Sequence, residues 1–284
     1  MKVLKFGGSS VAKPENIVKI KNIISTYEDQ IILVVSALGG VTDLLLQAGT
    51  MASSQDQSYK NVLTSLEERH LTTIKELLPV TAQSKVLSKV KSEFNVLETL
   101  LEGAYFIGEI TPKLSDKIVS YGELLSSYII SEYLISEKLD AEFKDSRDLI
   151  ITHKANGKNV VNFTKTNANC IAYFNSSHKK ITVCPGFIAT SEEGVSTTLG
   201  RGGSDYTAAI YAAAIDAEIL EIWTDVSGMY TANPKMVKQS KAIPHISYEE
   251  AMELSHFGAK VLYPPTIQPV LSKGISIVIK NTFS

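Results

Sequence analysis

Residues 2–48 read KVLKFGGSSVAKPENIVKIKNIISTYEDQIILVVSALGGVTDLLLQA, and one pattern occurs in them twice. A β-prone apolar run gives way to a glycine pair, first Gly7-Gly8 and then Gly39-Gly40, and apolar residues at helical spacing follow. Residues 31–35 are apolar throughout, as a strand buried on both faces requires. Strand, glycine turn and helix in repetition predict an α/β fold with a mostly parallel sheet and helices on its faces.

The rest of the chain extends this pattern after an interruption. Residues 56–108 lose the strand signal and predict a helical insertion with a break near Pro79. We expect one three-layer αβα domain over residues 1–284, with an N-terminal lobe of about 1–200 for the substrate and a C-terminal lobe of about 201–284 for the nucleotide. The other expected helices cover 123–137, 206–216 and 248–257, and the other strands cover 141–143, 149–152, 181–184, 219–224 and 275–279.

Composition excludes several classes of protein. The 284 residues include 28 basic and 30 acidic side chains, and a net charge of −2 argues against a nucleic-acid or membrane-surface protein. No apolar run is long enough for a signal peptide or a membrane span. Cys170 and Cys184 form no C-x-x-C and no metal-like spacing with the five histidines. We expect a cytoplasmic protein without metal-ligating residues of its own.

The first candidate site is KFGGSS, residues 5–10, at the end of the first expected strand. Ligands of parallel sheets collect at the carboxyl ends of the strands. The N–H groups of Gly7 and Gly8 can point at anionic oxygens, and Lys5 adds a full positive charge. Phosphate suits this combination, although an ordinary turn with a solvated lysine would use the same residues. No Walker A sequence occurs.

The second candidate site is LGRGGSD, residues 199–205, before an Ala-rich helix. Arg201, flanked by glycines, presents a planar fork that suits a carboxylate. Ser204 or Asp205 could simply cap the helix. Three glycines in four residues exceed what capping needs, so a binding loop is favoured. Asp205 stands where G-x-G-x-x-G needs its last glycine, so this is no dinucleotide fingerprint.

The third candidate site is WTDVSGMY, residues 223–230, followed by Asn233-Pro234-Lys235. An adenine could pack on Tyr230 and Lys235 could reach phosphate, but a turn stabilised by Asp225 explains the segment equally well. Glu123 could bind a ligand ammonium or be a first-turn glutamate favoured by the helix dipole. Lys260 could bind phosphate or end a helix. Taken alone, the structural explanation is favoured for both single charges.

Together these segments resemble the aspartokinase family of the amino-acid kinase superfamily over essentially the whole chain. In order they read KFGGSSVA, SYGELLS, PGFIA, LGRGGSDYTAA, EIWTDVSGMYTANPK, SYEEAMELSHFGAKVLYP and IKNT. The resemblance implies the amino-acid kinase fold, ATP and Mg²⁺ as cofactors, and phosphorylation of L-aspartate on its β-carboxylate. That reaction gives 4-phospho-L-aspartate and ADP and is the first step toward lysine, threonine and methionine.

The resemblance also implies residue roles. Lys5, Gly7, Gly8 and Lys260 would hold the β- and γ-phosphates, and Ser36 would line the transfer cleft. The nucleotide would be bound by Thr224, Asp225, Tyr230 and Lys235. Aspartate would be surrounded by Thr42, Glu123, Phe187, Arg201, Gly202 and Ser204, with Glu123 on its ammonium and Arg201 on its α-carboxylate. Asp205 would position the catalytic lysines, Lys5 and Lys260.

The sequence departs from the family pattern at three places. The family usually reads D-P-R where this chain has Asn233-Pro234-Lys235, and a histidine is commoner where Tyr263 stands. Aspartokinases usually continue into ACT domains, sometimes followed by a homoserine dehydrogenase, whereas this sequence stops at Ser284. We therefore expect either part of a longer or bifunctional enzyme or a short form, with regulation undetermined and a homo-oligomer left open.

Two alternatives remain. One is another kinase of the superfamily that acts on glutamate, N-acetylglutamate, carbamate or UMP; the combination of Glu123 and Arg201 favours a free amino acid. The other is a non-catalytic nucleotide-binding sensor. Retention of Lys5 and Lys260 together with Asp205 argues against the sensor, because binding alone does not need every phosphate-handling group.

Overall fold

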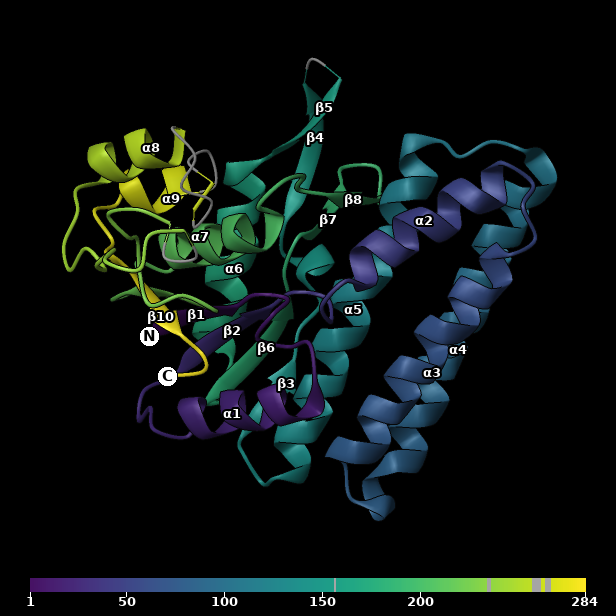
Figure 1. Ribbon diagram of the computed structural model, residues 1–284, viewed down its shortest axis with the longest axis horizontal. Coiled ribbons are helices and arrows are strands. Elements are labelled where there is room, and N and C mark those ends of the chain that lie inside the picture. Colours follow the sequence, from purple (N-terminus) through teal and green to yellow (C-terminus); the bar gives the residue numbers. More distant parts are fainter. Residues whose placement is uncertain (156, 234–235, 257–261, 264–266) are drawn as a thin grey trace.

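A six-stranded sheet forms the centre of the computed structural model, which describes residues 1–155, 157–233, 236–256, 262–263 and 267–284 (Figure 1). Its strand order is β10-β9-β1-β2-β6-β3, and every neighbouring pair is parallel. The bounds are β1 Lys2–Phe6, β2 Ile31–Val35, β3 Ala141–Phe143, β6 Ile181–Pro185, β9 Leu220–Thr224 and β10 Ile277–Asn281. The predicted parallel α/β sheet is confirmed.

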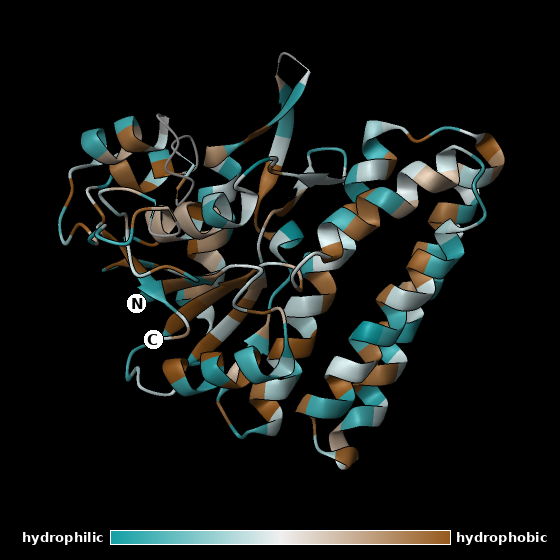
Figure 2. Ribbon diagram, in the orientation of Figure 1, coloured by the Kyte–Doolittle hydropathy of each residue, from teal (hydrophilic) through white to brown (hydrophobic). Residues whose placement is uncertain are grey.

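Helices cover both faces of this sheet, which gives the expected three layers. Side chains alternate across β2: Leu33 joins the core under α1 (Pro14–Ile24) and α5 (Pro112–Ser136), whereas Val34 joins the core under α6 (Phe163–Ser176) and α7 (Gly203–Ala214). Figure 2 shows the central strands as largely hydrophobic, while the neighbouring helices are banded. The unbroken apolar run of β2 therefore reflects burial on both faces.

The predicted helical insertion is also present. It consists of α3 Tyr59–Leu77 and α4 Val80–Ile107, with Pro79 directly before α4, and it follows α2 Val41–Ser53, the helix expected after Gly39-Gly40. In Figure 1 the α3–α4 hairpin stands beside α5, on the side of the molecule opposite α8. The prediction for α5 was wrong at its start, because the helix begins at Pro112 and not near 123. Glu123 therefore lies in the middle of α5, and the first-turn explanation of this residue is wrong as well.

A second sheet was missed by the sequence analysis. Its order is β5-β4-β7-β8, with β4 Ile151–Ala155, β5 Lys158–Val161, β7 Ile188–Ser191 and β8 Ser196–Thr198. Three of these strands have at most four residues, and β8 consists of Ser and Thr alone. Such short polar strands lack the apolar signal of a buried strand. Helix α6 was missed too, and β10 begins two residues later than the expected 275.

The remaining described elements are short. They are the 3-10 helix η1 Ser146–Asp148, α8 Tyr248–His256 and α9 Gln268–Leu271. None of the helices in the described part of the chain is long and apolar enough to cross a membrane.

Candidate active site

A cleft of about 260 Å³ lies at the carboxyl ends of β1, β2 and β6, where parallel sheets place their ligands. It brings together residues that are up to 200 positions apart in the sequence. Eight of the predicted site residues line it, together with two further glycines. The lining consists of Lys5, Ser36, Thr42, Glu123, Phe187, Gly200, Gly202, Gly203, Ser204 and Asp205.

An ion pair forms one side of the cleft. Lys5 Nζ lies 2.6 Å from Asp205 Oδ1, and the two side chains are only 11 % and 14 % exposed. Lys5 is the penultimate residue of β1, and Asp205 lies in the first turn of α7. Neither Ser204 nor Asp205 caps this helix, because Gly202 occupies the cap position and no side-chain capping bond forms. Asp205 therefore does not cap the helix, and its carboxylate pairs with Lys5.

The first glycine loop differs in one respect from the prediction. The N–H of Gly7 donates to the carbonyl of Trp223 at 3.1 Å, so it cannot also point at a phosphate. A side chain at Gly7 would instead contact Lys5 Nζ at 3.4 Å, so the residue leaves room for the ammonium. In the described part of the chain the N–H of Gly8 has no hydrogen-bond partner, which leaves it available to an anion.

The two glycine loops of the N-terminal repeat pack against each other. A Cβ added to Gly39 would lie 3.1 Å from the carbonyl oxygen of Gly8 and 3.0 Å from Ala12 Cβ. The N–H of Ser36 donates to the carbonyl of Phe6 at 3.1 Å, which joins the ends of the two strands. Close approach of these backbones requires glycine at position 39. The sequence analysis used Gly39 only as a turn signal.

Two other loops close the opposite wall. Phe187 has φ of +69°, a left-handed conformation that is unusual for a residue other than glycine. Its N–H donates to Thr207 Oγ1 at 2.9 Å, and its carbonyl accepts from Leu199 at 2.8 Å. A Cβ on Gly203 would lie 2.6 Å from the Phe187 ring. Backbone strain of this kind concentrates at functional sites, and no sequence pattern signalled it.

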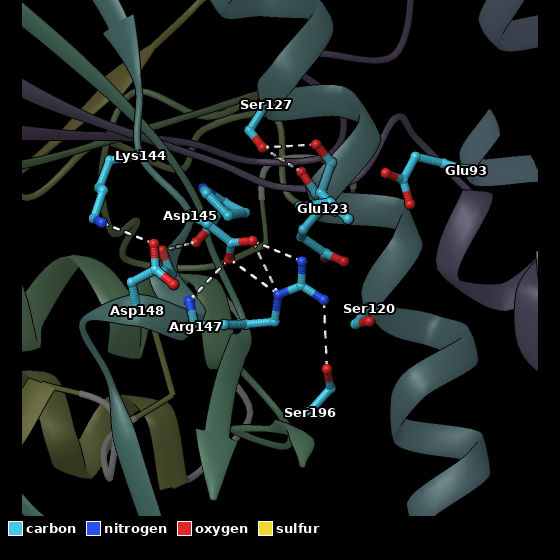
Figure 3. Close-up of polar contacts among 12 residues, drawn as sticks. Glu93, Ser120, Glu123, Ser127, Lys144, Asp145, Arg147, Asp148 and Ser196 are labelled. Atoms are coloured by element: carbon cyan, nitrogen blue, oxygen red, sulfur yellow. Dashed lines mark hydrogen bonds and ion pairs between the residues drawn. The ribbon is translucent and has the colours of Figure 1, made fainter. Parts of the chain in front are cut away.

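Glu123 provides a buried carboxylate on the other side of the cleft. The residue is 4 % exposed, and Oε2 is buried without a hydrogen-bond partner among the described residues. Burial raises the pKa of Glu123 to about 7, although the Ala37 backbone N–H and the Lys5 charge act in the other direction. Figure 3 shows Glu123 on α5, one turn before Ser127, whose hydroxyl donates to the Glu123 carbonyl at 2.6 Å.

Among the described residues, Arg147 and Lys5 each pair with a carboxylate other than Glu123. Arg147 appears in the same view, but its Nε and Nη2 donate to Asp145 at 3.0 and 2.6 Å (Figure 3). Lys5 is already held by Asp205. A buried carboxylate in this situation favours a ligand that brings its own positive charge.

Arg201 does not line the cleft in this structure. It is exposed, and its guanidinium carbon lies 5.3 Å from the centre of the Tyr263 ring. Its neighbours Gly200 and Gly202 do line the cleft, and both have positive φ. The arginine therefore sits on a glycine loop at the rim, where a change of side-chain rotamer moves the guanidinium.

The residues predicted to bind a nucleotide are described only in part. Thr224 ends β9, its hydroxyl donates to Asp225 at 3.2 Å, and Asp225 is exposed. Tyr230 forms an antiparallel bridge with Ala242. Thr224, Asp225 and Tyr230 do not line the cleft described above. The predicted phosphate contacts Lys235 and Lys260 lie outside the described residues.

A larger pocket, of about 520 Å³, lies on the second sheet and contains none of the predicted residues. Two of its carboxylates are already engaged within the protein. Asp116 accepts from Asn159 at 3.1 Å and from Thr198 at 2.8 Å, and Glu192 pairs with Lys165 at 2.8 Å. Chemistry rather than size therefore identifies the candidate active site.

Comparison with known sequences places the chain among kinases. The model of the amino acid kinase family matches residues 1–281. Bifunctional aspartokinase/homoserine dehydrogenase 1 of Arabidopsis thaliana, a chloroplastic protein, is 35 % identical over 284 residues, which cover 99 % of this chain and 31 % of that protein. Aspartokinase 1 of the same plant is 33 % identical, with 99 % and 50 % of the two chains covered. The chain thus spans half or less of these relatives.

Solved structures agree with the sequence comparison. Escherichia coli aspartokinase III in complex with aspartate and ADP has a TM-score of 0.90 and 29 % identity, over all of this chain and 62 % of that one. Aspartate kinase of Clostridium acetobutylicum has a TM-score of 0.83 and 31 % identity, over all of this chain and 61 % of that one. An isopentenyl phosphate kinase, 15 % identical with a TM-score of 0.57, shares the fold alone.

Proposed function

Because the chain belongs to the amino acid kinase family, we propose that it transfers the γ-phosphoryl group of ATP to the β-carboxylate of L-aspartate. Relatives named aspartokinase align with nearly all of it, which supports this choice of acceptor within the family. The observation that carries the proposal is that two groups of side chains with opposite charge preferences for a ligand lie in one cleft. A lysine fixed by a carboxylate suits phosphate, and an unpaired buried carboxylate suits an ammonium.

Aspartate would be oriented by its two α-substituents. Its ammonium would lie against Glu123 Oε2, which has no other partner among the described residues. Its α-carboxylate would be bound by Arg201 after the guanidinium turns from Tyr263 toward the cleft. The β-carboxylate is then the only reactive group left to face ATP. The remaining walls would be formed by Thr42, Phe187, Gly202 and Ser204.

Phosphoryl transfer to a carboxylate needs no covalent intermediate, since the acceptor is already a nucleophile. The protein would hold the acceptor in line with the γ-phosphorus and neutralise the charge on the phosphoryl oxygens. Lys5 would donate to those oxygens in an orientation set by Asp205, and the N–H of Gly8 would add a neutral donor. From the sequence we assign Lys260 to the same task, Ser36 to the wall between the two substrates, and Thr224, Asp225, Tyr230 and Lys235 to the nucleotide.

Mg²⁺ would enter with the nucleotide. It prefers oxygen ligands, and phosphate oxygens and water supply them. In the part of the chain that the structure describes, no group of three His, Cys, Asp or Glu side chains could hold a metal ion, so we assign no protein ligand. When bound, the ion would neutralise phosphate charge beside Lys5. A cytoplasmic location and self-association stay predictions from the sequence.

Acceptor choice tests the proposal. The purified chain is incubated with ATP, Mg²⁺ and hydroxylamine, which traps an acyl phosphate as a hydroxamate. L-aspartate is compared with L-glutamate and N-acetylglutamate and, in an assay of ADP release, with UMP and carbamate. We expect hydroxamate with aspartate alone. Turnover with another acceptor and not with aspartate would refute the acceptor assignment and leave the family assignment standing.

A further inference from the structure

Two buried hydroxyl groups join the glycine loop to the end of the last strand. Ser10 and Thr282 are 0 % and 3 % exposed, and their oxygens lie 2.7 Å apart. Ser10 Oγ also donates to the carbonyl of Trp223 at 3.4 Å. Either hydroxyl can be the donor of the 2.7 Å bond, so the Thr282 and Ser10 hydroxyls and the Trp223 carbonyl form one chain of buried polar contacts.

Backbone hydrogen bonds close this chain into a network. The Trp223 carbonyl also accepts from the N–H of Gly7 at 3.1 Å, and the N–H of Ser10 donates to the carbonyl of Gly7 at 2.9 Å. The N–H of Thr282 donates to the carbonyl of Thr224 at 2.9 Å. The loop after β1, the end of β9 and the end of β10 are thus tied together on the edge of the sheet where the cleft lies.

We propose that Thr282 is a positioning residue for the nucleotide, which through Ser10 holds the Gly7–Gly8 loop in the shape that receives the phosphates of ATP. Thr282 does not line the cleft; its backbone N–H contacts Thr224, a predicted nucleotide-binding residue, and its hydroxyl contacts Ser10. It acts through Ser10, 272 residues away in the sequence. The proposal rests on the proposed function only in taking ATP as the ligand, and not in the choice of acceptor.

The physical reason is preorganisation. Hydrogen bonds fix this short loop, so that the Gly8 N–H and the Lys5 ammonium are held in one arrangement. Ligand binding then does not have to order the loop. Without the Thr282 hydroxyl, the buried Ser10 hydroxyl loses its partner at 2.7 Å, and the loop is held less firmly. We expect a tenfold loss of ATP affinity, which corresponds to about 1.4 kcal/mol.

The test uses the single tryptophan of the chain as a reporter. Trp223 stacks on Phe6 with ring centres 5.5 Å apart, next to the loop in question. We expect Thr282→Val to raise the Kd for MgATP about tenfold in a fluorescence titration, and to raise the KM for ATP with little change in the KM for aspartate. Thr282→Ser, which restores the hydroxyl, should return both constants to the wild-type values.

Thr152→Val is the matched control. Thr152 is also buried, and its hydroxyl lies 2.9 Å from Thr197 Oγ1 on the second sheet, away from the glycine loop. It should leave ATP binding unchanged. Equal Kd values for wild type and Thr282→Val, or the same loss in Thr152→Val, would overturn the proposal.

Ser10→Ala provides a second route if Thr282→Val does not fold. It should weaken ATP binding by a similar factor. The double variant with Thr282→Val should bind ATP no more weakly than the single variant that has the lower ATP affinity. Unchanged ATP binding in Ser10→Ala would also overturn the proposal. A wild-type chain that binds ATP but does not phosphorylate aspartate would refute the acceptor assignment alone. The effect of Thr282→Val on the Kd for MgATP could still be measured by the fluorescence titration.

Discussion

The two sides of the cleft differ in whether their charged side chains have a partner within the protein. On the phosphate side, Lys5 and Asp205 neutralise each other at 2.6 Å before any ligand arrives. On the amino-acid side, the Glu123 carboxyl is buried, lacks a partner for Oε2 among the described residues, and has its pKa raised to about 7. The first arrangement fixes the direction of a cation toward phosphate. The second leaves a buried carboxyl that a cationic ligand would satisfy. Under the proposed function, this difference would let one small cleft distinguish two substrates.

The largest expected effect comes from removing the phosphate-side cation. Lys5→Ala should lower kcat about a thousandfold, because a fixed donor to the transferred group is lost. The circular dichroism spectrum should stay that of the wild type. Lys165→Ala is the control, since Lys165 also pairs with a carboxylate, Glu192, but at an exposed site. A Lys5→Ala enzyme with near-normal kcat would remove Lys5 from the mechanism.

A smaller effect is expected on the amino-acid side. Glu123→Gln keeps the shape of the side chain but removes the charge, so the KM for aspartate should rise about 30-fold or more with a much smaller change for ATP. In the wild type this KM should also rise as the pH falls below about 7, since the carboxyl is then protonated. The variant should lose that pH dependence. Equal losses for both substrates would mean that Glu123 supports the fold rather than aspartate.

Arg201→Lys should have a milder effect, about tenfold on the KM for aspartate, because a lysine keeps the charge but loses the bidentate fork. The KM for ATP should change by less than twofold. This variant tests whether the amino-acid side of the cleft also binds the α-carboxylate of aspartate. Equal increases in both KM values would place Arg201 outside substrate recognition.

The smallest effect concerns a second unpaired buried group that does not face the cleft. His70 is fully buried in α3, Nδ1 donates to the Leu66 carbonyl at 2.7 Å, and Nε2 has no partner among the described residues. Burial lowers the pKa of His70 from 6.5 to about 4. In that window the unfolded chain binds the proton and the folded chain does not, so stability falls as the pH drops from 6.5 toward 4.

His70→Leu should remove this part of the acid destabilisation, up to about 1.4 kcal/mol per pH unit, in denaturant titrations at several pH values. The pH dependence of the KM for aspartate should be unchanged, in contrast to Glu123→Gln. A variant with the wild-type slope of stability against pH would show that His70 does not titrate as its surroundings indicate.

The parts that the sequence could predict are those in which local pattern and burial agree. Ile31–Val35 is apolar throughout and is a central strand, and the KFGGSS and LGRGGSD segments both reach the cleft. The second sheet could not be predicted, because a strand such as Ser196–Thr198 has no apolar signature. The role of Gly39 depends on contact with Gly8, and the Lys5 charge near Glu123 is paired with Asp205. These are relations between distant segments, and a linear pattern does not contain them.

Proton release on aspartate binding tests the central claim most directly. At about pH 6, Glu123 with a pKa of about 7 is mostly protonated, and an ammonium placed against it should expel close to one proton. Calorimetric titrations of aspartate in buffers of different ionisation enthalpy measure that number. We predict about one proton released near pH 6, almost none near pH 8.5, and none in Glu123→Gln. Aspartate binding without proton release at the lower pH would contradict the account, because the buried carboxylate would then not be the partner of the substrate ammonium.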